Sequence, residues 1–293
     1  MIGFQPSVGT PDPLRERDFR EVARLFRRAV HSHAHIDWRT LEEWLPDPAF
    51  CGWVMRAGGD IRAVLAATLH YPPQQRYGVA WLRFILPGVG VAHWPALGSL
   101  WEALRDDLRR RGIEQVAVIV LDRWVADVAK SFGFTETNAV ITLERRGGPV
   151  PPAPEPPLVL REMQGRRELE DVVRVDQAAF GSIWQYDYDT LAAAQREAAT
   201  FSRLELNGEI VGYQLSTQHG TSGHLARLAV LPDEQGKGYG AVLIGHLLRY
   251  FEARGISVIT VNTQEDNVRS QRLYRRLGFV PTGHRAPVWT VEV

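Results

Sequence analysis

Gln235-Gly-Lys-Gly-Tyr-Gly240 decides the fold, because this turn joins two segments of different character. Residues 225–232 before it form an apolar run typical of a buried strand, and residues 239–254 after it repeat apolar side chains with helical spacing. The glycines leave backbone N–H groups open to approach, and the positive end of the helix dipole adds to these donors. The stretch therefore predicts a receptor for a pyrophosphate.

The glycine turn alone is a weak signal, since glycine clusters also occur in ordinary strand-to-helix connections. No Gly-Lys-Ser/Thr ends the turn, so it is not a Walker loop, and the dinucleotide fingerprint G-x-G-x-x-G is absent. Other residues must therefore decide which ligand carries the pyrophosphate.

Two later segments complete the pattern, Val261-Asn-Thr-Gln-Glu-Asp-Asn267 and Leu273-Tyr-Arg-Arg-Leu-Gly-Phe279. The combination of Gln-x-x-Gly-x-Gly, a later Asn and Leu-Tyr-x-x-Leu-Gly-Phe resembles the GNAT family of acyl-CoA-dependent N-acyltransferases. The resemblance covers the chain from about residue 158 to the C-terminus. It implies an α/β fold in which a mixed sheet carries helices on both faces.

The composition favours a folded cytoplasmic protein with two domains. The 293 residues are 45% hydrophobic, enough to fill two cores of ordinary size. Lys+Arg and Asp+Glu number 34 each, and this neutral balance argues against a nucleic-acid partner. Cys51 is the only cysteine, so no intrachain disulfide can form, as expected in a reducing compartment. We find no signal-peptide pattern and no apolar run near the roughly 20 residues of a membrane span, so no membrane partner is expected.

The two halves of the chain resemble each other across a proline-rich stretch at 147–157. Phe84-Ile-Leu-Pro87 in the first half corresponds to Ala229-Val-Leu-Pro232 in the second, and Phe132-Gly-Phe134 corresponds to Leu277-Gly-Phe279. A repeat of this length indicates duplication of one α/β unit. We therefore predict two tandem GNAT-like folds, at residues 1–146 and 158–293, joined by an extended linker at 147–157.

The first half keeps the framework and loses the residues that carry the chemistry. Gly90-Val-Ala-His-Trp-Pro95 stands where the second half has its glycine turn. His93 and Trp94 would crowd an approaching pyrophosphate, and Pro95 lacks a backbone donor. Ala129 replaces the second half's Tyr274, and Asp122 replaces its Asn267. We expect residues 1–146 to be a degenerate, non-catalytic copy.

The second half is expected to alternate strands and helices. The predicted strands are 158–161, 202–206, 210–218, 223–230, 258–263 and 289–293, with Asn207-Gly208 as a hairpin turn. The predicted helices are 166–179, 239–254 and 268–277, with a further short helix between 181 and 199.

The resemblance implies a set of cofactor-binding residues for acetyl-CoA. The strand at 228–230 would pair through its backbone with the pantetheine arm, the turn would bind the pyrophosphate, and Asn267 would reach the arm. The set is Leu228, Ala229, Val230, Gln235, Gly236, Lys237, Gly238, Tyr239, Gly240, Ala241 and Asn267. Two alternatives stay open: Asn267 as the N-cap of the following helix, and Lys237 as a solvated side chain.

Tyr274 and His224 are the predicted catalytic residues. The resemblance places Tyr274 near the sulfur, and a phenol with a pKa near ~10 suits a general acid for a thiolate. The alternative is that Tyr274 is a half-buried aromatic side chain on a helix and has no catalytic role. His224 and Asn262 stand where family members carry a Glu base. An imidazole can replace that base, but a structural histidine, or water as the proton acceptor, explains the sequence equally well.

We expect the loop at 180–189 to bind the amine acceptor. Trp184 and Tyr186 would form its walls and Asp187 would hold a cationic amine, against the alternative that they anchor the loop. Asp189 is interpreted as a helix cap, because the helix is expected to start at Thr190. The His31-x-His-x-His35 pattern follows a predicted helix without a Cys or carboxylate cluster, so we expect a solvated loop and no metal site.

Three functional hypotheses follow from the resemblance. The first is transfer of an acetyl group from acetyl-CoA to a primary amine of a small molecule or peptide, with Tyr274 as general acid. The second is a sensor that binds acyl-CoA without turnover. The third is a narrower form of the first, because the tandem layout also resembles mycothiol synthases, which acetylate a cysteinyl pseudodisaccharide amine. The sequence specifies neither the acceptor, nor the acyl length, nor the oligomeric state.

Overall fold

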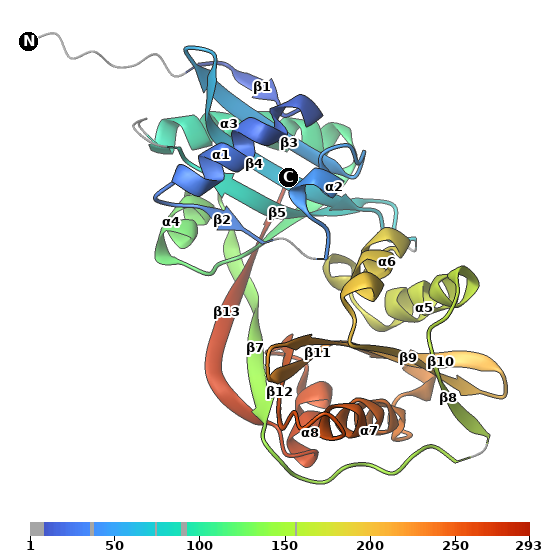
Figure 1. Ribbon diagram of the computed structural model, residues 1–293. Helices are drawn as coiled ribbons and strands as arrows, with labels where there is room; N and C mark the ends of the chain where they lie inside the picture. The colour runs from blue at the N-terminus through green and yellow to red at the C-terminus, as the bar shows by residue number, and fades with distance from the viewer. Residues whose placement is uncertain (1–8, 36–37, 74, 89–92, 156) are drawn as a thin grey trace, which may run out of the picture. The chain divides into compact units, whose positions relative to one another are not determined.

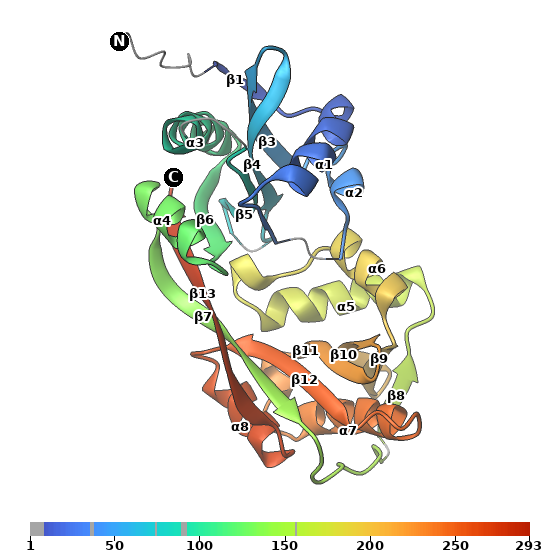
Figure 2. The same ribbon diagram turned by 60° about the vertical axis from the view of Figure 1, so that its left-hand side comes forward.

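The computed structural model describes residues 9–35, 38–73, 75–88, 93–155 and 157–293. The chain forms two compact units (Figures 1 and 2). The first unit comprises Met1–Thr137 with Pro287–Val293, and the second comprises Asn138–Ala286. Each unit has a mixed sheet and its own hydrophobic core, so the predicted α/β class is confirmed.

The second unit is a sheet of strand order β7-β12-β11-β10-β9-β8, in which only β11 and β12 run parallel. Helices α5 and α6 lie on one face of this sheet, and α7 and α8 lie on the other (Figure 1). Its elements are β8 (Leu158–Glu162), α5 (Arg166–Ala179), η2 (Ser182–Trp184), α6 (Tyr188–Glu197), β9 (Thr200–Leu206), β10 (Glu209–His219), β11 (Ser222–Val230), η3 (Pro232–Glu234), α7 (Tyr239–Glu252), β12 (Val258–Gln264) and α8 (Val268–Arg276).

Local sequence explains where these elements begin and end. Asn207 and Gly208 have φ values of 51° and 87°, the left-handed pair that a two-residue hairpin turn requires. Helix α7 begins after Gly238, whose φ of 90° favours glycine. Leu225, Ile244 and Phe251 pack together in the core beneath β11, which explains the apolar face of α7.

The first unit repeats this order of elements with shorter helices near its N-terminus. Its strand order is β1-β3-β4-β5-β6-β13, and β5 and β6 run parallel, as β11 and β12 do. Its elements are β1 (Pro11–Pro13), η1 (Glu16–Asp18), α1 (Phe19–Arg28), β2 (His33–Ala34), α2 (Leu41–Trp44), β3 (Phe50–Ala57), β4 (Asp60–His70), β5 (Gly78–Leu86), α3 (His93–Arg110), β6 (Ile113–Ile119) and α4 (Arg123–Ser131). Of the altered turn at Gly90–Pro95, residues 90–92 lie outside the described residues.

Two long strands contribute to both units. In the second unit, the later part of β7 (Thr135–Arg145) pairs antiparallel with β12, from Val140↔Gln264 to Arg145↔Ile259. In the first unit, the end of β13 (Val280–Glu292) pairs antiparallel with β6, from Val288↔Ile119 to Glu292↔Gln115. Each sheet is therefore completed by a strand from the other half of the sequence.

This exchange moves the boundaries away from the predicted ones. The units divide at residues 137/138 and 286/287 and not at 147–157. The proline-rich stretch belongs to the second unit, where Arg249 Nη1 donates to Pro151 O at 2.5 Å and Val150 packs against the core. The last strand also begins at Val280, before the predicted Trp289, because residues before the boundary lie along β7, with Thr282 Oγ1 3.1 Å from Thr142 O.

Two features are absent from the part of the chain that the structure describes. None of their helices is both long and apolar enough to cross a membrane. They also contain no group of three or more His, Cys, Asp or Glu side chains arranged to hold a metal ion.

Removing residues 287–293 is expected to destabilise the first unit strongly. Val288 and Thr290 are buried against β6, so deletion exposes that edge and opens the core. We expect a loss of about 3 kcal/mol or more, measured as a lower urea midpoint and faster proteolysis within residues 9–137. The exposed Glu292→Gln is the control and should leave the midpoint unchanged. An unaltered midpoint after the deletion would contradict the exchange.

Candidate functional site

A gap between β11 and β12 forms the centre of the site. The two strands pair from Ser222↔Val258 to Leu225↔Val261, and no further pair between them follows among the described residues. The separation begins at a β-bulge, because Ser216 pairs with Leu225 and Leu215 pairs with Arg227, which leaves Ala226 as an extra residue. The sheet therefore opens between its two parallel strands.

The strand edge that faces the gap offers free backbone groups. Leu231 N donates to Val211 O on β10 at 2.9 Å, whereas Val230 O accepts from Gln235 Nε2 at 2.9 Å on the other side. The N–H and C=O of one strand residue point to the same side, and successive residues alternate. Leu228 and Val230 therefore direct their N–H groups into the gap. We call residues 228–230 on this side the open edge.

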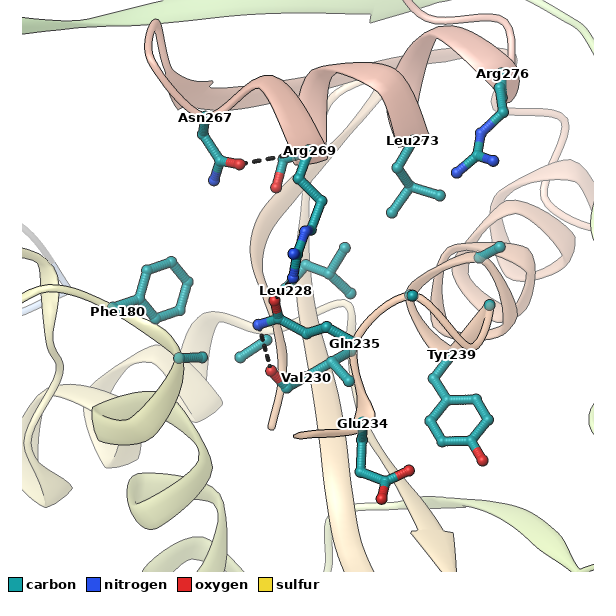
Figure 3. A pocket seen from close by; sticks show the side chains of 17 residues that line it. Phe180, Leu228, Val230, Glu234, Gln235, Tyr239, Asn267, Arg269, Leu273 and Arg276 are labelled. Carbon is teal, nitrogen blue, oxygen red and sulfur yellow. Dashed lines mark hydrogen bonds between the residues drawn. The ribbon is translucent and has the colours of Figure 1, made fainter. Parts of the chain in front are cut away.

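A cavity of about 460 Å³, the outer cavity, lies along the open edge (Figure 3). It is bordered by the strand end, the glycine turn with the start of α7, and α8. Every predicted cofactor-binding residue except Lys237 lines it. Lys237 Nζ instead forms an exposed ion pair with Glu234 Oε2 at 2.9 Å, which matches its solvated alternative.

The glycine turn presents bare backbone to the outer cavity. Gly236 and Gly238 have φ values of 85° and 90°, and no atom lies within 4 Å of where their Cβ atoms would be. A Cβ on Gly240 would meet Leu273 Cδ2 at 3.0 Å, so this glycine also allows α8 to approach α7. The N-terminus of α7 opens onto the same space, which favours an anion there.

Two arginines that the sequence analysis missed add positive charge to the outer cavity. Arg269 and Arg276 line it from α8, and Arg269 Nη1 donates to Gln235 Oε1 (Figure 3). Guanidinium groups suit phosphate oxygens. The signal was the spacing of Arg269, Leu273 and Arg276, since intervals of four and three residues place them on one helix face.

Tyr274 lies at a smaller cavity of about 60 Å³, the inner cavity. The outer and inner cavities share Phe180, Leu228, Asn267 and Ser270 in their walls. Tyr274 is 4% exposed and packs near Phe279. It is therefore more buried than the half-buried helix aromatic that was the alternative to a catalytic role. Burial raises the pKa of Tyr274, which keeps the phenol protonated. Asn267 also caps α8, accepting from Ser270 N at 3.0 Å, so its alternative role is observed.

His224 lines neither the outer nor the inner cavity. It lies on β11 before the gap, and its Nδ1 is 2.8 Å from Thr260 Oγ1. Burial, with a smaller effect of His219, lowers the pKa of His224 to about 4, so its imidazole is neutral near pH 7. Asn262, the other position examined for a base, lines the inner cavity and accepts from Thr142 Oγ1 at 2.8 Å.

Residues 169–279 match the model of the Acetyltransferase (GNAT) family. The chain carries a GNAT acetyltransferase domain. The match includes the open edge, the glycine turn and Tyr274. Members of this family use acetyl-CoA.

Known proteins support the tandem arrangement. A solved tandem GNAT protein from the clavulanic acid biosynthesis pathway is 18% identical, with a TM-score of 0.65 over 96% of this chain and 98% of its own. A probable N-acyltransferase of unknown function from Enterococcus faecalis is 12% identical, with a TM-score of 0.70 over 97% and 72% of the two chains. At these identities the likeness concerns the fold.

Curated relatives are named mycothiol acetyltransferases. The protein from Frankia alni is 29% identical over 66% of this chain and 63% of its own. The protein from Acidimicrobium ferrooxidans is 25% identical over 78% of this chain and 83% of its own. For the first relatives, the alignment spans only about three fifths of their length, 63% and 60%.

The predicted acceptor residues of the GNAT domain all have structural contacts. Asp187 caps α6, because its Oδ1 accepts from Thr190 N at 2.7 Å. The cap is thus Asp187 and not Asp189, since the helix begins at Tyr188, before the expected Thr190. The Trp184 carbonyl accepts from Arg227 Nη2, and the Tyr186 ring centroid lies 3.9 Å from Arg227 Cζ.

Arg227 and Asp176 form a buried ion pair that the sequence analysis missed. Arg227 Nε and Nη2 donate to the two carboxylate oxygens of Asp176 at 2.8 and 2.9 Å. Asp176 is fully buried and Arg227 is 9% exposed. Arg227 also lines the inner cavity of the GNAT domain. Nothing in the sequence pattern linked a helix Asp to a strand Arg 51 residues later.

In the first unit, a strand of the chain itself occupies the edge that is open in the GNAT domain. β5 has a bulge at Arg83 and pairs with β6 only up to Trp81↔Ala117. Beyond this point β4 takes one edge of Phe84 and Ile85, and β2 takes the other, with His33↔Ile85 and Ala34↔Phe84. Phe84-Ile85 corresponds to Ala229-Val230, so β2 pairs with the edge that corresponds to the open edge.

The β2 pairing corrects the expectation of a solvated histidine loop. His33 is 2% exposed, and His35 N donates to Arg83 O at 2.9 Å. The strand covers only His33–Ala34, so the His31-x-His-x-His35 alternation extends beyond it on both sides. Its position after a helix concealed it, because a two-residue strand has no pattern long enough to detect.

Gly238→Trp is expected to abolish CoA binding, because an indole there fills the space beside the turn. Gly255→Trp is a matched control: Gly255 also has positive φ, of 70°, and open space at its Cβ, but does not line the outer cavity. Titration calorimetry should give one CoA per wild-type chain, no binding for the first variant and unchanged binding for the second. Equal loss in both variants would show backbone strain and not obstruction of a site.

Proposed function

We propose that the protein transfers an acetyl group from acetyl-CoA to a primary amine of a small molecule or peptide. The observation that carries this proposal is the open edge, which leaves the Leu228 and Val230 N–H groups unpaired beside the glycine turn. An edge of this kind inside a sheet is costly unless another backbone-like chain pairs with it. The amide-bearing pantetheine arm is such a chain.

The proposed binding mode follows the two cavities from one end to the other. The pyrophosphate would contact the turn at 236–241 and the N-terminus of α7, with Arg269 and Arg276 balancing its charge. The pantetheine arm would run along the open edge between β11 and α8. The thioester would then reach the inner cavity, where Leu228 and Tyr274 both lie.

The proposed reaction is direct attack on the thioester. The amine nitrogen forms a bond to the acetyl carbonyl carbon, and the Leu228 N–H stabilises the resulting oxyanion. Collapse breaks the carbon–sulfur bond, and the sulfur takes the proton of the Tyr274 hydroxyl as it leaves. The attacking amine loses its proton to His224, directly or through water. Its neutral imidazole suits this role, and its distance from the cavities favours the route through water.

We infer one working site in each chain. The first unit has β2 on the edge that pantetheine would use, and Ala129, in its α4, at the place of Tyr274. The first unit would then be a non-catalytic copy. A reducing cytoplasm supplies acetyl-CoA and suits the single buried thiol of Cys51.

The relatives narrow the first acceptors to be assayed. Because the curated relatives are mycothiol acetyltransferases, a cysteinyl amine on a sugar scaffold is the leading small-molecule candidate. The second candidate function is acyl-CoA binding without turnover. The observation in its favour is His224, whose low pKa and position outside the cavities make it a weak base.

Tyr274→Phe is expected to lower turnover by about 100-fold and to change CoA affinity by less than about threefold, because only proton transfer to sulfur is lost. The measurement is thiol release from acetyl-CoA across cysteinyl sugars, peptides and aminoglycosides, with calorimetry for CoA. Tyr250→Phe, which lies outside both cavities, is the control. Equal turnover in wild type and Tyr274→Phe would remove the acid role. Binding of CoA with no thiol release from any amine would favour the sensor.

The pH dependence tests His224 as the base. Only the neutral imidazole accepts a proton, so the rate must fall as the pH drops through its pKa. Since burial lowers the pKa of His224 to about 4, the acid limb of kcat should lie near pH 4 and not near the ordinary 6.5. His224→Gln should abolish this limb and lower the plateau about 100-fold. His246→Gln, on α7, is the control. A limb that persists in His224→Gln would exclude the assignment.

A further inference from the structure

The ion pair between Arg227 and Asp176 lies directly behind the open edge. Arg227 is the residue before Leu228, and its side chain points to the face of the sheet that α5 covers. Leu228 points to the other face, where it packs beside Leu243 of α7. The bulge at Ala226 produces this arrangement, because the extra residue turns Arg227 away from the face that Leu225 shares.

Arg227 is held on several sides. Asp176 binds Nε and Nη2, and the Trp184 carbonyl also accepts from Nη2. The Phe180 and Tyr186 ring centroids lie 3.6 and 3.9 Å from Cζ. Guanidinium stacking on aromatic rings together with a bidentate carboxylate fixes the plane of the group. The side chain is therefore anchored to α5 and to the loop that follows it.

Asp176 is fixed in the same way. Its Oδ1 accepts from Tyr186 N at 2.7 Å, and its Oδ2 accepts from the Tyr213 hydroxyl on β10. Burial, and then the charge of Asp176, raise the pKa of Tyr213, so this phenol stays protonated and donates. The carboxylate thus joins α5, β10 and β11. Such a network is rigid when every member has its partners.

The anchored residue controls the neighbouring peptide group. The Leu228 N–H belongs to the planar peptide unit that joins Arg227 and Leu228. Holding the Arg227 side chain against α5 fixes the position of its Cα, and with it the direction of that N–H. It also holds β11 at the point where β11 leaves β12.

We propose that Arg227 and Asp176 are positioning residues that keep the gap between β11 and β12 open and aim the Leu228 N–H at the acyl oxygen of the bound thioester. This inference rests on the proposed acetyl transfer. The ion pair acts through the backbone and does not itself touch the reacting atoms. Tyr213 supports it by holding Asp176.

The first unit supplies an internal comparison. Counting back from the matching Leu-Pro segments, Leu82 corresponds to Arg227 and His31 corresponds to Asp176. Neither an arginine nor a carboxylate stands at these two positions, so the pair itself is not repeated there. In that unit β2 fills the place of the open edge. Burying two charges adds little stability by itself, which favours a role beyond folding.

The test uses the full chain with Arg227→Met, Asp176→Leu and Tyr213→Phe combined. This triple variant removes the tether and leaves none of the three buried side chains with an unpaired polar group, a replacement that proteins often tolerate. The readout is the infrared carbonyl band of bound acetyl-CoA labelled with ¹³C at the carbonyl carbon. In wild type we expect a shift to lower frequency relative to free acetyl-CoA, since a hydrogen bond weakens the C=O bond. In the triple variant this shift should disappear, turnover should fall at least about tenfold, and CoA affinity should change less than about threefold.

Two further variants keep the test decisive. Tyr213→Phe alone removes one hydrogen bond and keeps the charges paired, so it should give an intermediate band position even if the triple variant does not fold. Arg203→Met is the matched control, because Arg203 is 8% exposed and paired with Glu168 and Glu205 but lines neither cavity. It should keep the wild-type band.

The outcomes separate the two proposals. A wild-type band in every variant that binds acetyl-CoA overturns the positioning role and leaves the proposed function intact. An equal loss of the shift in Arg203→Met also overturns it, because the effect would then be general destabilisation. Absence of acetyl-CoA binding by the wild-type protein overturns both proposals.

Discussion

The separation of β11 from β12 is the constraint on which the rest of the second unit depends. Two parallel neighbours normally continue their ladder, yet here one extra residue, Ala226, ends the pairing after Leu225↔Val261. Because of the bulge, Leu228 and Val230 face the outer cavity and not a neighbouring strand. The bulge also turns Arg227 toward α5. Tyr274 lies at the inner cavity, which Leu228 also lines. The glycine turn follows five residues after the strand end and lines the outer cavity beside this opening.

The same topology has two outcomes in one chain. Both units have a bulge in the strand before the gap, at Ala226 and at Arg83, and both lose the parallel pairing soon after. In the first unit the chain satisfies the exposed backbone itself, through His33 and Ala34. In the second unit that backbone stays available. The difference is a short segment between α1 and α2, so a copy of the fold can be closed without any change in the order of its sheet.

Patterns among neighbouring residues predicted most of the site. They could not predict which residues far apart in the sequence lie together in the fold. The turn at 235–240, the cap at Asn267 and the helix 166–179 depend on neighbouring residues, and the structure has each of them. Arg227 and Asp176 were not recognised, because each is an ordinary surface type and only the folded chain joins them. The sharing of β7 and β13 between the two units was not predicted, for the same reason. The β-branched and aromatic residues at 288–291 indicate a strand, but nothing in them specifies β6 as the partner.

The shared strands have a consequence for how the chain acquires its structure. The sheet of the first unit lacks β13 until residues 287–293 have been synthesised, although residues 9–137 leave the ribosome long before. Its β6 edge therefore remains exposed during most of translation, whereas the second unit is contiguous from residue 138 to residue 286. A cut at the proline-rich stretch would leave each fragment with the strand that completes the sheet of the other unit.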